Sequence, residues 1–168
     1  RDLLKGIIVQ SGNDACIVVA EGISGDEDTF ADLMNAKAKE IGLVNSNFTN
    51  STGWPDDNHY MTPLDLAILA KSLMNNFPNF YSLFKEKEFT YNNIKQSNRN
   101  PLLYSYKYAD GLKTGYTDIS GYSLASTAIK GNRRLIAVLS GMDNVKERKD
   151  ETIKVLEWAF REYTNINL

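Results

Sequence analysis

Two short motifs carry side chains that could bind an anion and take part in proton transfer. Lys113-Thr114-Gly115 places a cation beside a hydroxyl and ahead of a glycine. Ser11-Gly12-Asn13 offers a carboxamide and a hydroxyl, a group that both donates and accepts hydrogen bonds. Each motif alone has an ordinary structural explanation, since the lysine could be a solvated strand residue and the serine motif a helix-cap turn. The interpretation of either motif therefore depends on the other.

The lysine motif is expected on a strand just ahead of a hairpin. Tyr122–Ile129 is a β-branched and aromatic run, Gly131-Asn132 is a turn pair, and Leu135–Leu139 is apolar. Strands are predicted near residues 112–117, 121–129 and 133–141. Because alternate side chains of a strand share a face, Lys113 and Gly115 should point one way and Thr114 the other.

The serine motif is expected between two helices. Residues 2–9 place apolar side chains at helical spacing, and the motif interrupts this pattern. Asn13 or Asp14 can cap a second helix from residue 15 to about 23. Further helices are predicted over residues 26–41, 62–76 and 145–163, with a short one near 78–84. Helices, then strands, then one last helix indicate an α+β fold.

The segments between these elements are less regular. Residues 44–61 are polar and are predicted to form a long ordered loop, of a kind often found near a site. His59 lies in this loop, and we expect it to fix the loop rather than to act in catalysis. Residues 88–94 are predicted as one strand, and residues 101–109 as irregular.

Composition excludes several classes of function. With 168 residues, of which 42% are hydrophobic, the chain suits one domain with a real core. A net charge of −2 gives no electrostatic case for nucleic acid. No apolar run approaches a membrane span, and no signal peptide is recognised. The single cysteine, Cys16, excludes an internal disulfide and a cysteine-based zinc site, and we expect no metal or cofactor.

Together, the two motifs resemble two of the three signatures of penicillin-binding proteins and serine β-lactamases, which are S-x-x-K, S-x-N and K-T-G. The surrounding residues look like the D-alanyl-D-alanine carboxypeptidase branch over nearly the whole chain. The stretches that carry this resemblance are Leu3–Ala15, Gln96–Asn100, Asp110–Gly115 and Arg148–Phe160. The resemblance implies a β-lactamase/transpeptidase-like α+β fold, in which an antiparallel sheet adjoins a helical subdomain.

The third signature, which contains the nucleophile, has no credible match. Only Ser82-Leu83-Phe84-Lys85 fits S-x-x-K, but it follows S-x-N in the chain, which is the wrong order, and it lies in an aromatic packing stretch. We therefore expect the true S-x-x-K to precede Arg1. Residues 1–168 would then be the C-terminal part of one catalytic domain that is incomplete at its N-terminus. Two family strands would also be missing, which would leave residues 133–141 as an open edge and allow self-association.

The resemblance implies roles in serine acyl transfer. The missing serine would attack the carbonyl of D-Ala-D-Ala, activated by the missing lysine. Ser11 would relay a proton between Lys113 and the leaving nitrogen, while Asn13 would hold the substrate amide. Lys113 would also supply positive charge near the substrate carboxylate.

Further positions would bind the substrate. Thr114 could hydrogen-bond the carboxylate, Gly115 would keep the strand open to the substrate backbone, and the N–H of Tyr116 would be half of the oxyanion hole. Many relatives have histidine at this last position, so pH dependence and substrate preference could differ here. Arg99 and Arg148 match family arginines, for which carboxylate binding and structural salt bridging are equally reasonable.

The resulting prediction is a penicillin-sensitive serine D-Ala-D-Ala carboxypeptidase that trims peptidoglycan pentapeptides outside the cytoplasm. Its partners would be stem peptides ending in D-Ala-D-Ala and β-lactams, with membrane association only through segments absent here. One alternative is a serine β-lactamase, although residues 45–62 carry only Asp56 and Asp57 and no clear glutamate-containing deacylation loop. Another is a non-catalytic binding domain with the same fold.

Overall fold

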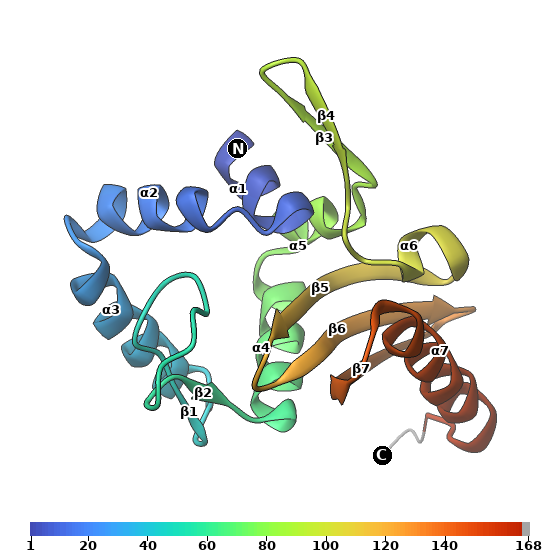
Figure 1. The fold of residues 1–168 in the computed structure, drawn as a ribbon. Coiled ribbons are helices and arrows are strands. Elements are labelled where there is room, and N and C mark those ends of the chain that lie inside the picture. Colours follow the sequence, from blue (N-terminus) through green and yellow to red (C-terminus); the bar gives the residue numbers. More distant parts are fainter. Residues whose placement is uncertain (166–168) are drawn as a thin grey trace.

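The strand that carries the lysine motif lies at the edge of a three-stranded antiparallel sheet, in the order β5-β6-β7. In the computed structural model, which describes residues 1–165, these strands span Ala109–Thr117, Gly121–Lys130 and Arg133–Met142 (Figure 1). Gly131 adopts a φ of 65° in the tight turn between β6 and β7, as the hairpin pattern predicts. The predicted strands and their antiparallel pairing are confirmed.

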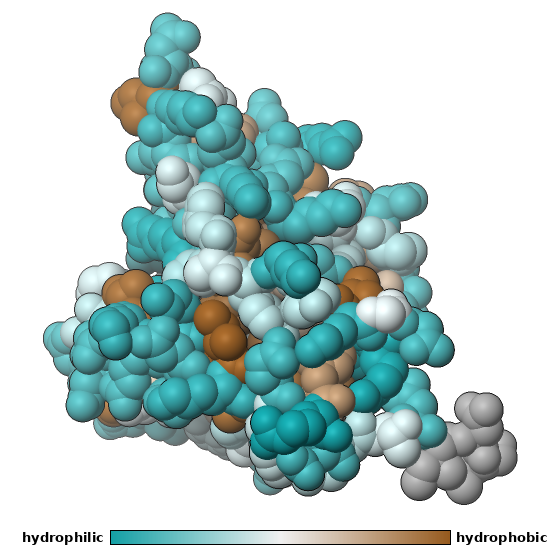
Figure 2. Space-filling model, turned by 90° about the vertical axis from the view of Figure 1, so that its right-hand side faces the viewer, coloured by the Kyte–Doolittle hydropathy of each residue, from teal (hydrophilic) through white to brown (hydrophobic). Residues whose placement is uncertain are grey.

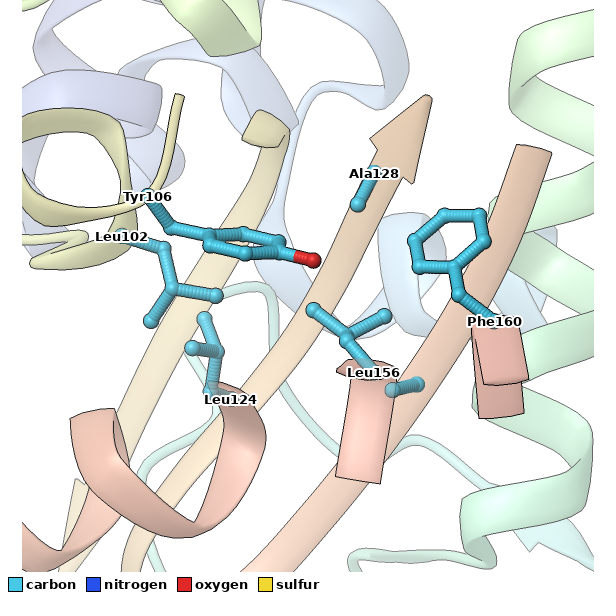
Figure 3. Packing of buried hydrophobic residues seen from close by; sticks show 7 residues of the cluster. Leu102, Tyr106, Leu124, Ala128, Leu156 and Phe160 are labelled. Carbon is cyan, nitrogen blue, oxygen red and sulfur yellow. The ribbon is translucent and has the colours of Figure 1, made fainter. Parts of the chain in front are cut away.

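Two long helices cover opposite faces of this sheet. They are α4, Pro63–Asn76, and α7, Val145–Glu162 (Figure 1). Neighbouring residues of β6 divide between the two faces, since Leu124 packs in the cluster under α7 and Ala125 in the cluster under α4. Figure 3 shows Leu156 of α7 pointing into the cluster under α7. That cluster contains Leu102, Tyr106, Leu124, Ala128, Ala137, Leu156 and Phe160.

Side-chain caps explain where the longer helices begin. Helix α3, Glu27–Glu40, follows Asp26, whose carboxylate accepts from the N–H of Thr29 at 2.7 Å. Before α4, the Thr62 hydroxyl accepts from the N–H of Asp65 at 3.2 Å. Before α7, the Asn144 carboxamide accepts from the N–H of Glu147 at 2.9 Å. Each cap satisfies a backbone donor that has no partner inside its helix.

The first helical segment breaks at the serine motif, as predicted. Helix α1, Asp2–Lys5, continues as a π-helical segment over Gly6–Gln10 and ends at Ser11. The predicted capping of α2, Asn13–Ser24, was wrong: Gly12 is the N-cap residue and provides no side-chain bond. Asn13 is already the first helical residue, so its carboxamide is not used as a cap.

Two other predictions needed correction. Residues 88–97 form a hairpin where one strand was predicted over residues 88–94, with β3 at Glu88–Tyr91 and β4 at Ile94–Ser97. Asn92 and Asn93 have φ values of 49° and 62°, which is the left-handed backbone that asparagine tolerates in hairpin turns. Residues 101–109 are not wholly irregular, since they contain the short helix α6, Leu102–Ser105, and the start of β5. The β3–β4 hairpin projects from the rest of the molecule (Figure 1).

The short segments between α4 and β3 also follow the sequence pattern. Helix α5, Pro78–Tyr81, leads into a 3₁₀ turn over Ser82–Lys85, where one short helix was predicted.

Polar contacts order the long loop at residues 44–61, as predicted. Its ends pair through β1, Ser46–Asn47, and β2, Tyr60–Met61. The fully buried Asp65 of α4 accepts from the N–H of Asn45 and the hydroxyl of Ser46, both at 2.7 Å. His59 accepts from the N–H of Thr49 at 3.1 Å, which confirms its predicted loop-fixing role.

The surface is mostly polar on the face that Figure 2 shows, where hydrophobic side chains reach the surface in separate patches. No helix within residues 1–165 is both long and apolar enough to cross a bilayer.

Candidate active site

Lys113 and Ser11, which are 102 residues apart in sequence, meet in the folded chain. The Lys113 ammonium donates to the Ser11 hydroxyl at 3.0 Å and to the Thr114 carbonyl at 3.0 Å. Ser11 has a left-handed backbone, with φ 57° and ψ 45°, at the end of the π-helical segment. Such a conformation costs a non-glycine residue about 1–3 kcal/mol and is typically retained where function requires it. The strained turn therefore positions the hydroxyl against the lysine.

A cleft of about 1180 Å³ surrounds this contact. Every residue that the sequence placed at a site lines it: Ser11, Asn13, Arg99, Lys113, Thr114, Gly115, Tyr116 and Arg148. The structure thus brings the predicted residues together from the turn at Ser11, the start of α2, the segment before α6, β5 and α7. Their chemical roles stay predictions.

The free edge of β5 explains why consecutive residues of the lysine motif reach one cleft. Lys113 and Thr114 do alternate, since their cross-strand partners Ala125 and Leu124 belong to clusters on opposite faces of the sheet. Both nevertheless line the cleft, together with Gly115. Because β5 is an edge strand, the cleft can follow its backbone and contact side chains from both faces. An extended peptide could pair with such an edge.

The cleft lowers the proton affinity of its lysine. Burial, followed by the charges of Arg99 and Arg148, lowers the pKa of Lys113 from 10.5 to about 8. The Lys113 side chain is therefore mostly protonated near neutral pH, but it loses its proton at a lower pH than a solvated lysine does. A group with this pKa, hydrogen-bonded to a hydroxyl, is suited to proton transfer.

The two arginines of the cleft are not used in ion pairs within residues 1–165. Arg148 is only 5% exposed, and burial lowers its pKa. Its Nε is buried without a hydrogen-bond partner in the described chain. Arg99 is exposed, but buried asparagines flank it, and the carboxamide of Asn98 accepts from the N–H of Asn100 at 2.9 Å. These features disfavour the salt-bridge alternative and leave two cations that line the cleft.

Sequence reasoning missed several cleft residues that come from loops. Trp54 and Ile119 line the cleft and are 69% and 88% exposed. Trp54 is held by Asn50, whose carboxamide accepts from its N–H at 3.0 Å. The polar composition of residues 44–61 indicated a loop near a site, but no local pattern singled out its tryptophan. Tyr122 of β6 also lines the cleft and had been assigned only to the hairpin.

The S-x-x-K match at Ser82 lies outside the cleft. Its hydroxyl donates to the Asn79 carbonyl at 2.8 Å, inside a turn between α5 and β3. Leu83 beside it is 2% exposed, so the segment packs against the body of the protein. Residues 1–165 contain no group of three His, Cys, Asp or Glu side chains placed to hold a metal ion.

Comparisons with known proteins agree with this geometry. A family model described as D-alanyl-D-alanine carboxypeptidase matches residues 1–144. The chain is 42% identical over 166 residues to D-alanyl-D-alanine carboxypeptidase DacA of Escherichia coli, a match that covers 98% of this chain and 41% of that protein. DacF of Bacillus subtilis is 42% identical over 167 residues, covering 97% of this chain and 43% of that protein. The chain therefore spans less than half the length of these relatives.

Solved structures show the same fold. Penicillin binding protein 5 from Haemophilus influenzae superposes with a TM-score of 0.92 at 43% identity, covering 95% of this chain and 47% of that one. Penicillin-binding protein D2 from Listeria monocytogenes, in its cefotaxime-bound form, gives a TM-score of 0.89 at 30% identity and covers 96% of this chain and 66% of that one. The predicted α+β transpeptidase-like fold is confirmed, and the chain belongs to the D-alanyl-D-alanine carboxypeptidase family.

Proposed function

We propose that the protein containing residues 1–168 removes the terminal D-alanine from peptides that end in D-Ala-D-Ala, through an acyl-enzyme on a serine. The observation that carries this proposal is the 3.0 Å contact between Lys113 and Ser11. The contact lies in a cleft that Arg99 and Arg148 also line. A proton relay next to cations fits a substrate with a scissile amide and a free carboxylate.

The cleft residues that the motifs supply have distinct parts in this reaction. Ser11 passes a proton between Lys113 and the leaving nitrogen, and Asn13 holds the substrate amide. Lys113, Thr114 and the arginines bind the terminal carboxylate. The N–H of Tyr116 donates to the carbonyl oxygen as negative charge develops there.

The proposal assigns the nucleophile to a serine outside residues 1–168, which then form the C-terminal part of one catalytic domain. Two observations support this assignment. Ser82, in the one S-x-x-K match, hydrogen-bonds Asn79 away from the cleft. Two curated relatives, DacA and DacF, are more than twice as long as this chain, since it covers 41% and 43% of them.

The same cleft is proposed to bind β-lactams, which present a carboxylate beside a strained amide. Support comes from the Listeria relative, which has been solved in cefotaxime-bound and ampicillin-bound forms. Because the proposed substrate is peptidoglycan, we place the protein in the periplasm or at the outer face of the bacterial cytoplasmic membrane.

The test is D-alanine release by the full-length protein from a peptide ending in D-Ala-D-Ala. Ser11→Ala should lower kcat by about 10²-fold or more, because the relay is lost. Ser82→Ala is the matched control and should leave kcat unchanged. An active Ser11→Ala enzyme, or a wild-type protein that releases no D-alanine, would contradict the proposal.

We also propose self-association of residues 1–168 through β7, the second edge of the sheet. In the described chain β7 pairs only with β6, and Leu135, Ile136, Val138 and Leu139 lie along it. Unpaired strand edges recruit other chains. Analytical ultracentrifugation of residues 1–168 should detect a dimer. Ser140 is exposed on β7, and Ser140→Lys should dissociate this dimer because it places a charge on the strand. A monomer at high concentration would refute the proposal.

A further inference from the structure

Arg148 is a buried cation for which the described part of the chain provides no counter-ion. It is 5% exposed, forms no ion pair within residues 1–165, and has a buried Nε with no hydrogen-bond partner there. The one acceptor that it has among the described residues is the Gly115 carbonyl, at a long 3.5 Å from Nη1. An unpaired buried charge is costly, so some other group must stabilise it.

The aromatic face of Tyr122 lies next to this guanidinium. The Cζ atom of Arg148 is 5.4 Å from the centre of the Tyr122 ring, which is within the range of a cation–π contact. Such a contact attracts the cation without using its N–H donors, which a carboxylate would occupy.

The ring of Tyr122 is itself held in place. Tyr116 is its cross-strand partner, and the two ring centres are 4.4 Å apart. The Tyr116 hydroxyl donates to Asp118 at 2.7 Å, and the hydroxyls of Thr117 and Ser120 contact each other at 2.7 Å in the following turn. A continuous series of contacts therefore links Arg148, the rings of Tyr122 and Tyr116, and the turn at residues 117–120.

We propose that Tyr122 is a positioning residue that substitutes for a counter-ion of Arg148 and keeps the guanidinium available for the free carboxylate of the substrate. This inference rests on the proposed function. It makes Tyr122 a determinant of specificity for peptides with a charged C-terminus over peptides with a neutral one.

The experiment compares two substrates of the full-length enzyme, a peptide ending in D-Ala-D-Ala and the same peptide as its C-terminal amide. The wild-type enzyme should prefer the free acid. Tyr122→Leu should raise KM for the acid by about tenfold, while kcat for the acid and kcat/KM for the amide change little. Tyr122→Phe should keep the preference for the acid. Tyr91→Leu, on the distant β3–β4 hairpin, is the matched control.

A second set of variants at Tyr122 distinguishes the effect of the cation–π contact from the effect of side-chain packing. Tyr122 is replaced by phenylalanine and then by its mono-, di- and trifluorinated analogues, which keep the ring but weaken its negative face. The preference for the acid should fall stepwise along this series. A preference that stays constant, in this series or in a folded Tyr122→Leu enzyme, would overturn the inference. A wild-type protein that cleaves neither substrate would instead refute the proposed function.

Discussion

At the residue scale, the proposed chemistry depends on the charge of Lys113. Burial lowers the pKa of Lys113 to about 8, so its ammonium is present at neutral pH and is lost as the pH rises through that value. In the unfolded chain the pKa of lysine is near 10.4, so between about pH 8 and 10 the unfolded state binds more protons. The contribution of Lys113 to the free energy of unfolding therefore increases as the pH rises through this range, while the positive charge on its side chain is lost.

Activity and stability should therefore respond to pH in opposite directions, so the two can be measured separately. In the full-length enzyme, kcat/KM for a D-Ala-D-Ala peptide should decline as the pH rises through about 8, while thermal stability does not fall from this cause. Lys113→Ala should lower kcat/KM by about 10²-fold or more and leave the fold intact, because it removes charge stabilisation more than packing. A flat profile up to about pH 10, or a folded Lys113→Ala enzyme with normal rates, would refute the role of this lysine.

At the scale of elements, the loop at residues 44–61 forms the wall of the cleft that carries Trp54. His59 accepts a hydrogen bond from Thr49 within it, and burial lowers the pKa of His59 from 6.5. Since the folded state favours neutral imidazole, this group stabilises the loop above about pH 6.5, and the stabilisation is lost as the pH falls below that value.

We therefore expect the loop to loosen in mild acid. The hydrogen-exchange protection factor of the Thr49 amide should fall between about pH 7.5 and pH 5.5, and His59→Asn should remove this dependence. The Glu147 amide is an internal control outside the loop, because it donates to the uncharged carboxamide of Asn144 at 2.9 Å. Equal loss of protection at both amides would show that His59 is not the cause.

Local sequence signals predicted most elements. Apolar periodicity placed α3, α4 and α7, and the Gly131-Asn132 turn placed the β6–β7 hairpin. The β3–β4 hairpin was missed because its turn residues, Asn92 and Asn93, lack the glycine that usually marks such turns. The cap of α2 was assigned wrongly because asparagine favours caps, whereas here Asn13 is a helical residue that lines the cleft.

The site was predictable only where motifs recur in a known family. Ser11, Asn13 and the residues around Lys113 belong to such motifs, and the chain folds them into one cleft. Trp54 and Tyr122 have no comparable signal, because their approach to the cleft depends on tertiary contacts from a loop and a neighbouring strand.

At the scale of the whole molecule, we propose that residues 1–168 supply the relay and the anion-binding side of a serine acyl-transfer site but not its nucleophile. The most direct measurement is intact-mass spectrometry after incubation with benzylpenicillin, on residues 1–168 and on the full-length protein. We expect a single penicilloyl adduct on the full-length protein, at a serine outside residues 1–168, and none on the shorter chain. An adduct on Ser11 or Ser82 of the shorter chain would contradict this proposal.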